Sequence, residues 1–236
     1  MRNVWIAIAV AIGLAAVAVP AVRAEIAEQG VQAGGVNAAL IRPKAPRASV
    51  ILLAGGDGAL GISANGEITR GLGNQLVRTR QAYAARGFAV LVPDIGYDLG
   101  ALVAYMGAIK RPVAVVGTSR GTQRAARGIA AGARPDRLVL TSGFLSDASG
   151  DPDNVAAILG SPAALPPTLI VHHRQDGCPK TQPAGVDPFL AWAHGKARVV
   201  WLSGGSDSGN PCEAQAHHGF AGLDGQVVSV VSSFVH

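Results

Sequence analysis

Short apolar runs rich in β-branched residues alternate with longer segments of mixed polarity along most of the chain. Runs that are apolar on both faces predict buried strands, and the segments between them are long enough for helices. The predicted strands cover residues 36–42, 50–54, 89–92, 113–116, 138–141, 168–171 and 197–202. Helices are predicted over 70–86, after the fourth strand as far as about 131, and over 226–234. This order predicts an α/β fold whose mostly parallel, doubly wound sheet is flanked by helices on both faces.

The first 24 residues have a different character. Arg2 gives a positive start, residues 4–19 form an unbroken apolar run, and small residues flank Arg23 at the end of the segment. This is typical of a secretory signal peptide cleaved after Ala24, and an uncleaved membrane anchor is the alternative. A cleaved signal peptide and an uncleaved anchor both predict a periplasmic or secreted protein with one domain over 25–236. No stable membrane insertion is expected unless the signal stays uncleaved.

Charge and aromatic content narrow the possible partners. The sequence has 20 Lys and Arg against 15 Asp and Glu, and removing the first 24 residues lowers the net charge from +5 to +3. A nucleic-acid binder would need a basic stripe interleaved with stacking rings, and neither occurs, so no nucleic acid is expected. Arg120, Arg124 and Arg127 could share one helix face that attracts anionic substrates, or form an ordinary solvated face.

The segment Gly117–Gly121 reads Gly-Thr-Ser-Arg-Gly, directly after the apolar run 113–116 and before a predicted helix. A sharp strand-to-helix turn of this G-x-S-x-G type exposes the serine hydroxyl, and the helix N-terminus beside it favours a developing oxyanion. The bordering glycines let neighbouring segments pass close by. Ser119 is therefore a candidate nucleophile, and a glycine-bordered helix cap without chemistry is the alternative. No Gly-rich phosphate-binding pattern occurs.

On these residues the chain resembles the α/β-hydrolase superfamily, in particular small members without a cap domain that are similar to dienelactone hydrolases. The resemblance covers roughly residues 36–236. It implies a catalytic domain that transfers acyl groups and needs no cofactor. Dienelactone hydrolases carry a cysteine nucleophile where this chain has Ser119, so their substrate is not implied.

The resemblance extends to the loop after the second predicted strand, where residues 55–58 read Gly-Gly-Asp-Gly. This looks like the His-Gly-Gly loop of esterases, with Ala54 where histidine often stands. It implies an oxyanion hole formed by the backbone N–H groups of Gly56 and Arg120. Asp57 is the alternative to Gly56.

In this fold the nucleophile is followed by the acid and then by the histidine. Asp176 lies a few residues beyond a late predicted strand, where the superfamily usually places its acid. Three rivals in the preceding Gly/Ser/Pro-rich loop are Asp147, Asp151 and Asp153. His218 precedes Gly219 and the last helix, as the superfamily's catalytic histidine does, and is the predicted general base. His217 is the alternative.

The two cysteines, Cys178 and Cys212, predict one disulfide in an exported protein. The first lies two residues after the predicted acid and the second six before the predicted base, so the bond would tie the two loops together. Two His-His pairs could also join the cysteines around zinc, but no metal-binding spacing occurs, so no metal is expected. His172 and His173 are expected in the site wall or the core.

The predicted site is open. Residues 145–167 are too short for a lid, and residues 57–69 are expected to line one wall. Such a site suits small acyl esters or the exposed ends of larger acylated molecules. The leading hypothesis is a serine hydrolase of ester or thioester bonds, and the second is an amidase or peptidase. The rival class is a non-catalytic periplasmic binding protein of the same fold.

Overall fold

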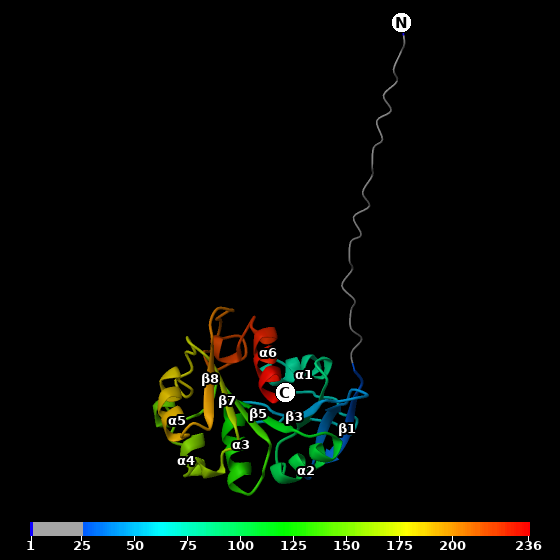
Figure 1. Cartoon of the computed structure of the whole chain (residues 1–236), viewed down its shortest axis with the longest axis horizontal. Coiled ribbons are helices and arrows are strands. Elements are labelled where there is room, and N and C mark those ends of the chain that lie inside the picture. Colours follow the sequence, from blue (N-terminus) through cyan, green and yellow to red (C-terminus); the bar gives the residue numbers. More distant parts are fainter. Residues whose placement is uncertain (2–25) are drawn as a thin grey trace.

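The computed structural model describes Met1 and residues 26–236 (Figure 1). The predicted signal peptide therefore lies outside the described residues. One sheet has eight strands: β1 (Glu28–Ala33), β2 (Val36–Ile41), β3 (Ala48–Leu53), β4 (Phe88–Pro93), β5 (Val113–Thr118), β6 (Arg137–Thr141), β7 (Thr168–His173) and β8 (Ala197–Leu202). The helices are α1 (Gln75–Ala85), α2 (Leu99–Ile109), α3 (Arg120–Ala130), α4 (Val155–Leu159), α5 (Val186–Trp192) and α6 (Asp224–Val235). None of the helices in this part of the chain has the length and apolar character of a membrane span.

The sheet runs in the order β1-β2-β4-β3-β5-β6-β7-β8. The strands from β4 to β8 in this order pair in parallel, whereas β2 is antiparallel to both β1 and β4. The chain passes from β3 to β4 on one side and later returns to β5 on the other. Parallel sheets bind ligands at such a switch point, beyond the carboxyl ends of the strands. The loops after β3 and β5 therefore meet where a site is expected.

Helices cover both faces of the sheet (Figure 1). Alternate residues of β3 face opposite sides, because side chains in a strand alternate in direction. Val50 and Leu52 pack with α1 and α6, whereas Ile51 and Leu53 pack with α2, α3 and α5. The predicted doubly wound α/β fold is confirmed.

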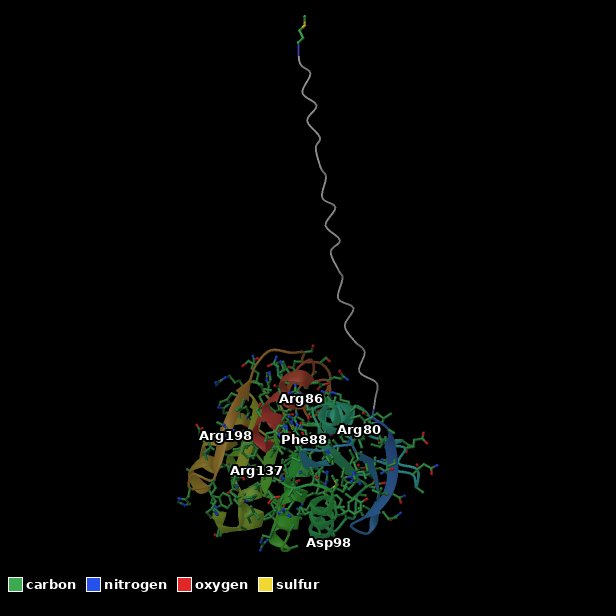
Figure 2. The ribbon with its side chains drawn as sticks, turned by 45° about the vertical axis from the view of Figure 1, so that its right-hand side comes forward. Arg80, Arg86, Phe88, Asp98, Arg137 and Arg198 are labelled. Carbon is green, nitrogen blue, oxygen red and sulfur yellow. A yellow bond between two sulfur atoms is a disulfide. The ribbon has the colours of Figure 1, made fainter. Side chains whose placement is uncertain are left out.

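The sequence did not predict the strand β1 or the helices α2 and α5. The strand β1 has polar residues at several positions, and it is fixed at the sheet edge by β2 and by an ion pair of 2.9 Å between Glu28 Oε2 and Nε of Arg80 on α1 (Figure 2). The helix α2 is almost entirely apolar and shows no clear helical period, although Asp98 caps its start by accepting from the N–H of Ala101. The predicted helix 70–86 begins only at Gln75, because the Asn74 side chain caps it there.

Candidate active site

Ser119 lies in a sharp turn between β5 and α3, with backbone angles of φ 52° and ψ −126°. Holding a non-glycine residue in this backbone conformation costs about 1–3 kcal/mol, and such strain persists only where surrounding contacts enforce it. Here the Ser119 N–H donates to the Thr141 carbonyl at 3.0 Å, and the Ser119 carbonyl accepts from the N–H and hydroxyl of Thr122. The side chain is partly exposed, so the turn presents the hydroxyl to solvent.

The two glycines of the turn are required by close backbone contacts. A Cβ atom on Gly117 would lie 2.6 Å from the carbonyl oxygen of Gly121, and one on Gly121 would lie 2.1 Å from the carbonyl oxygen of Leu53. Real Cβ atoms do not come so near to a carbonyl oxygen. The G-x-S-x-G pattern therefore reflects the packing of this turn against β3.

Two side chains from late loops meet beside Ser119. His218 Nδ1 lies 3.0 Å from Asp176 Oδ2, and both residues are buried. The other carboxylate oxygen of Asp176 accepts from the N–H of Cys178 at 3.0 Å. The backbone of His218 is held by the Ser142 hydroxyl, which donates to its carbonyl at 2.7 Å. The ring is thus oriented through Nδ1 by a fixed carboxylate.

Sequence reasoning missed Thr181. Its hydroxyl lies 3.0 Å from Asp176 Oδ2 and 2.9 Å from His218 Nδ1. A hydroxyl with one hydrogen can donate to the carboxylate and accept from the ring N–H at the same time. Thr181 therefore completes a buried three-residue network, and no sequence pattern marks this role.

The alternative histidine, His217, lies in a different environment. Its ring stacks on that of His173, with 4.1 Å between centroids and 13° between planes. Its Nδ1 lies 3.3 Å from the Gln175 carbonyl and 3.6 Å from a carboxylate oxygen of Asp207. His218, in contrast, lines the same pocket as Ser119.

That pocket is a small hollow of about 60 Å³ at the carboxyl end of the sheet. Its walls are Gly55, Gly56, Asn74, Gln75, Thr118, Ser119, Cys212, Glu213, Ala214, His218 and Gly219. The expectation that residues 57–69 line one wall is wrong. That loop is held by Asp94 instead, whose carboxylate accepts from the N–H groups of Leu60 and Ile62 at 2.8 and 2.9 Å. The wall is formed instead by residues 74–75 and 212–214.

The predicted oxyanion loop lies against the serine. A Cβ atom on Gly55 would lie 3.1 Å from Ser119 Cβ, and Gly56 has φ +60°, a conformation that suits glycine. Arg120 begins α3, where backbone N–H groups lack partners within the helix. The alternative donor, Asp57, lies past this point, and its carboxylate accepts from the N–H of Ala59 at 3.0 Å.

The three alternative acids contact other side chains. Asp147 accepts from the Asn154 amide at 2.8 Å, Asp151 pairs with Lys180 at 3.1 Å, and the Asp153 carboxylate pairs with Arg127. Asp176 is the carboxylate that contacts the pocket histidine. Asp176 and His218 are thus in contact, and His218 and Ser119 line the same pocket.

The expected disulfide is present and links Cys178 to Cys212, with 4.6 Å between the Cα atoms. Cys178 follows Asp176 in its loop, and Cys212 lines the pocket. The bond therefore joins the loop that carries the carboxylate to the loop that precedes the histidine.

We expect the Cys178→Ser/Cys212→Ser variant to be less stable than the wild type by about 3–4 kcal/mol, because the bond links two residues that are 34 positions apart and so restricts the unfolded chain. The measurement is urea unfolding with and without reductant. Reductant should lower the wild-type midpoint and leave that of the variant unchanged. Equal midpoints for oxidised wild type and variant would contradict the expectation.

The paired histidine His172 is fully buried on β7. Its Nδ1 lies 3.2 Å from the His173 carbonyl oxygen, which can only accept, so Nδ1 carries the hydrogen. The unprotonated Nε2 lies 4.0 Å from Asp176 Oδ2 and, within the described residues, has no hydrogen-bond partner. Burial lowers the pKa of His172 below its ordinary value of 6.5. No group of three or more His, Cys, Asp or Glu side chains in residues 26–236 is placed to hold a metal ion.

This burial predicts a pH dependence of stability. As the pH falls below 6.5, the unfolded chain protonates His172 while the folded protein resists it, so stability falls towards the lower folded-state pKa. We expect the urea midpoint of the wild type to drop more between pH 7.5 and 5.5 than that of His172→Asn, whose amide does not titrate. Equal drops in the two proteins would refute this role of His172.

Among the comparisons with known proteins, solved structures match this chain. No protein-family model matches the sequence, and neither does any curated protein sequence. An esterase of Pyrococcus furiosus has a TM-score of 0.61 at 16% identity over 89% of each chain. A serine hydrolase homologue of Coxiella burnetii has a TM-score of 0.59 at 15% identity, over 89% of this chain and 97% of that one. An esterase domain of Rhodothermus marinus has 0.57 at 14%, over 84% and 92%. At these identities the likeness establishes the fold alone.

Proposed function

The chain has the α/β-hydrolase fold, and from this premise we propose that it is a serine hydrolase of small acyl esters. The observation that carries the proposal is that His218, hydrogen-bonded to Asp176, lines the same pocket as the strained, partly exposed Ser119. Nucleophile, orienting acid and base follow one another in the chain order that this fold uses. The esterases among the similar structures support the same class of reaction.

The proposed reaction has two halves. His218 Nε2 takes the proton of the Ser119 hydroxyl as the oxygen attacks the acyl carbon, and the N–H groups of Gly56 and Arg120 receive the negative charge of the tetrahedral intermediate. His218 then gives the proton to the leaving alcohol, which departs from an acyl-serine. Water, activated by the same ring, attacks the acyl-serine and releases the acid. Asp176 keeps the proton on Nδ1 and stabilises the imidazolium.

The pocket size argues for short acyl groups. A hollow of about 60 Å³ holds an acetyl or propionyl group more readily than a long chain. Thioesters of the same acids fit equally well, whereas amides and peptides are the second candidate substrates.

The compartment is also a proposal. The apolar segment that follows Arg2 and the disulfide between Cys178 and Cys212 both support export to the periplasm or the medium, where disulfides persist. Small acylated molecules outside the cytoplasm are then the proposed substrates.

We expect Thr181→Val to lower kcat by about tenfold with little change in KM. Valine keeps the shape of threonine but loses the hydroxyl that contacts both Asp176 and His218, at a cost of about 1–1.5 kcal/mol per buried hydrogen bond. Steady-state kinetics on nitrophenyl acetate measure the effect, and Thr181→Ser, which keeps the hydroxyl, is the matched control. A serine variant as impaired as the valine variant would refute the role of the hydroxyl.

The proposed function is tested with a series of nitrophenyl esters from acetate to octanoate, with nitroacetanilide alongside. The wild type should hydrolyse the shortest esters most efficiently and the anilide much more slowly. Ser119→Ala sets the background. If no ester is hydrolysed above that background, the chain is better described as a binding protein of this fold. If the octanoate is the best substrate, the assignment to short acyl groups is wrong.

A further inference from the structure

Arg124 lies on α3, five residues after Ser119, and its guanidinium reaches back to the loop after β3. It donates to three successive carbonyl oxygens. Its Nη2 donates to the carbonyl of Ala54 and, at 3.3 Å, to the carbonyl of Gly55. Its Nη1 donates to the carbonyl of Gly56 at 3.2 Å. These are the residues of the predicted oxyanion loop.

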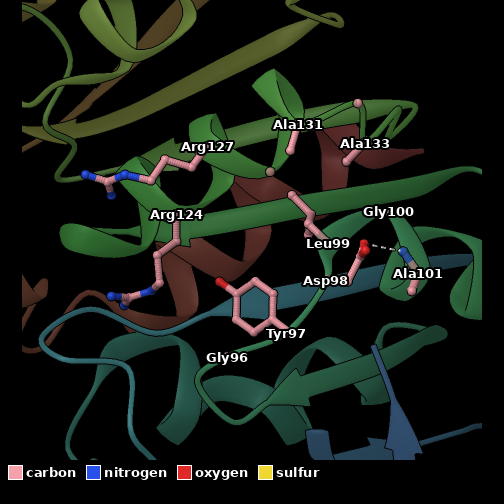
Figure 3. Close-up of a pocket in the computed structure, with 12 residues that line it drawn as sticks. Gly96, Tyr97, Asp98, Leu99, Gly100, Ala101, Arg124, Arg127, Ala131 and Ala133 are labelled. Carbon is pink, nitrogen blue, oxygen red and sulfur yellow. Dashed lines mark hydrogen bonds between the residues drawn. The ribbon is translucent and has the colours of Figure 1, made fainter. Parts of the chain in front are cut away.

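The loop continues around the same guanidinium. A Cβ atom on Gly58 would lie 2.9 Å from Arg124 Cζ, so the backbone passes directly against the positive group. The Asp57 carboxylate favours the charged form of Arg124. The Tyr97 side chain lies beside the guanidinium, as Figure 3 shows. Burial raises the pKa of the Tyr97 hydroxyl to about 12, and the nearby Arg124 opposes that rise. Burial also lowers the pKa of Arg124, but a guanidinium stays charged in proteins.

The direction of these carbonyls fixes the direction of the N–H groups. In a trans peptide the C=O and the following N–H point in opposite directions. The carbonyl of Gly55 points to Arg124, so the N–H of Gly56, in the same peptide plane, points away from the guanidinium. The loop also passes close to Ser119, because a Cβ atom on Gly55 would lie 3.1 Å from Ser119 Cβ.

We propose that Arg124 is a positioning residue that holds the oxyanion loop, so that the Gly56 N–H faces the reacting carbonyl. The inference rests on the proposed function. It explains why a partly buried arginine follows the nucleophile on α3, although no sequence pattern distinguishes Arg124 from Arg120 and Arg127. A planar group with several N–H donors suits three adjacent carbonyls, whereas a lysine ammonium would serve them as a single point charge.

Arg124→Met is the test variant. Arg127→Met is the matched control, because Arg127 lies on the same helix but pairs with the Asp153 carboxylate. We expect Arg124→Met to lower kcat for nitrophenyl acetate by about 30-fold or more, with KM within about twofold, because a misplaced oxyanion donor acts in the transition state. Arg124→Lys should recover only part of the loss. The control should keep both constants within about twofold.

A second readout does not depend on activity. Hydrogen–deuterium exchange of the peptide spanning residues 54–58 should be faster in Arg124→Met than in the wild type and unchanged in Arg127→Met. Arg124 also borders a cavity of about 600 Å³ that includes Tyr97 and Gly128 (Figure 3), so millimolar guanidinium chloride can enter. It should restore part of the lost kcat in Arg124→Met and none in Ser119→Ala.

Three results would overturn the proposal: wild-type kcat in Arg124→Met, equal losses in Arg124→Met and Arg127→Met, or a loss of kcat with unchanged exchange in residues 54–58. Failure of the proposed function looks different. In that case the wild type itself neither hydrolyses the ester nor reacts with a fluorophosphonate, and the catalytic role of Arg124 falls with it.

Discussion

His218→Ala is expected to lower kcat/KM for nitrophenyl acetate by about 10³-fold or more, whereas His217→Ala should stay within about threefold of the wild type. The first variant removes the group that moves the proton between Ser119 and the leaving alcohol. The second removes a ring that stacks on His173 and does not line the pocket that contains Ser119. Two adjacent histidines with opposite outcomes separate a chemical role from a general effect on the loop.

Circular dichroism and urea unfolding of both variants provide the control for folding. The account requires that His218→Ala remain folded while inactive. If His217→Ala were the inactive variant and His218→Ala were active, the assignment of the base would be reversed. If both kept wild-type activity, neither histidine would act as the base.

Gly121→Ala should be the most damaging single-methyl change in the turn. The added Cβ would lie 2.1 Å from the Leu53 carbonyl oxygen and 2.9 Å from that of Ala54. Because both of these oxygens belong to the backbone, the turn and β3 would have to move apart. We expect a loss of stability of more than about 3 kcal/mol together with loss of turnover, because the same movement displaces Ser119 from the loop after β3.

Gly225→Ala is the matched control for this substitution. Gly225 lies in the first turn of α6, and no heavy atom lies within 4 Å of its added Cβ. Alanine is the better helix former, so this variant should be as stable as the wild type or up to about 1 kcal/mol more stable. Urea unfolding compares the three proteins. A Gly121→Ala variant with wild-type stability and turnover would contradict the contact-based account of the turn.

The parts of the fold that could be predicted from the sequence are those with strong local patterns. Strands β2 to β8 are short runs rich in apolar residues, and the parallel strands β3 to β7 are continuously apolar because they are buried, so all seven were found near their observed positions. The nucleophile turn has a fixed glycine spacing because the backbone contacts of Gly117 and Gly121 leave no room for a side chain. Asp176 and His218 were singled out by their order along the chain, and their side chains are in contact.

The remaining features depend on contacts between distant segments. Thr181 meets His218 across 37 residues, and Arg124 meets Ala54 across 70 residues, so neither contact leaves a local pattern. The loop 57–69 was expected at the pocket, but it is held elsewhere by the Asp94 carboxylate, which lies more than 30 residues away. Tertiary hydrogen bonds, rather than local propensity, decide where such polar segments lie.

The central claim is that the Ser119 hydroxyl is a nucleophile activated by His218. The most direct test is reaction of the wild type with a fluorophosphonate, followed by intact-mass analysis and tandem mass spectrometry of the peptides. The account predicts one adduct per chain, located on Ser119, and none on Ser119→Ala or His218→Ala. An unmodified wild-type protein, or an adduct on another residue while Ser119 stays free, would contradict it.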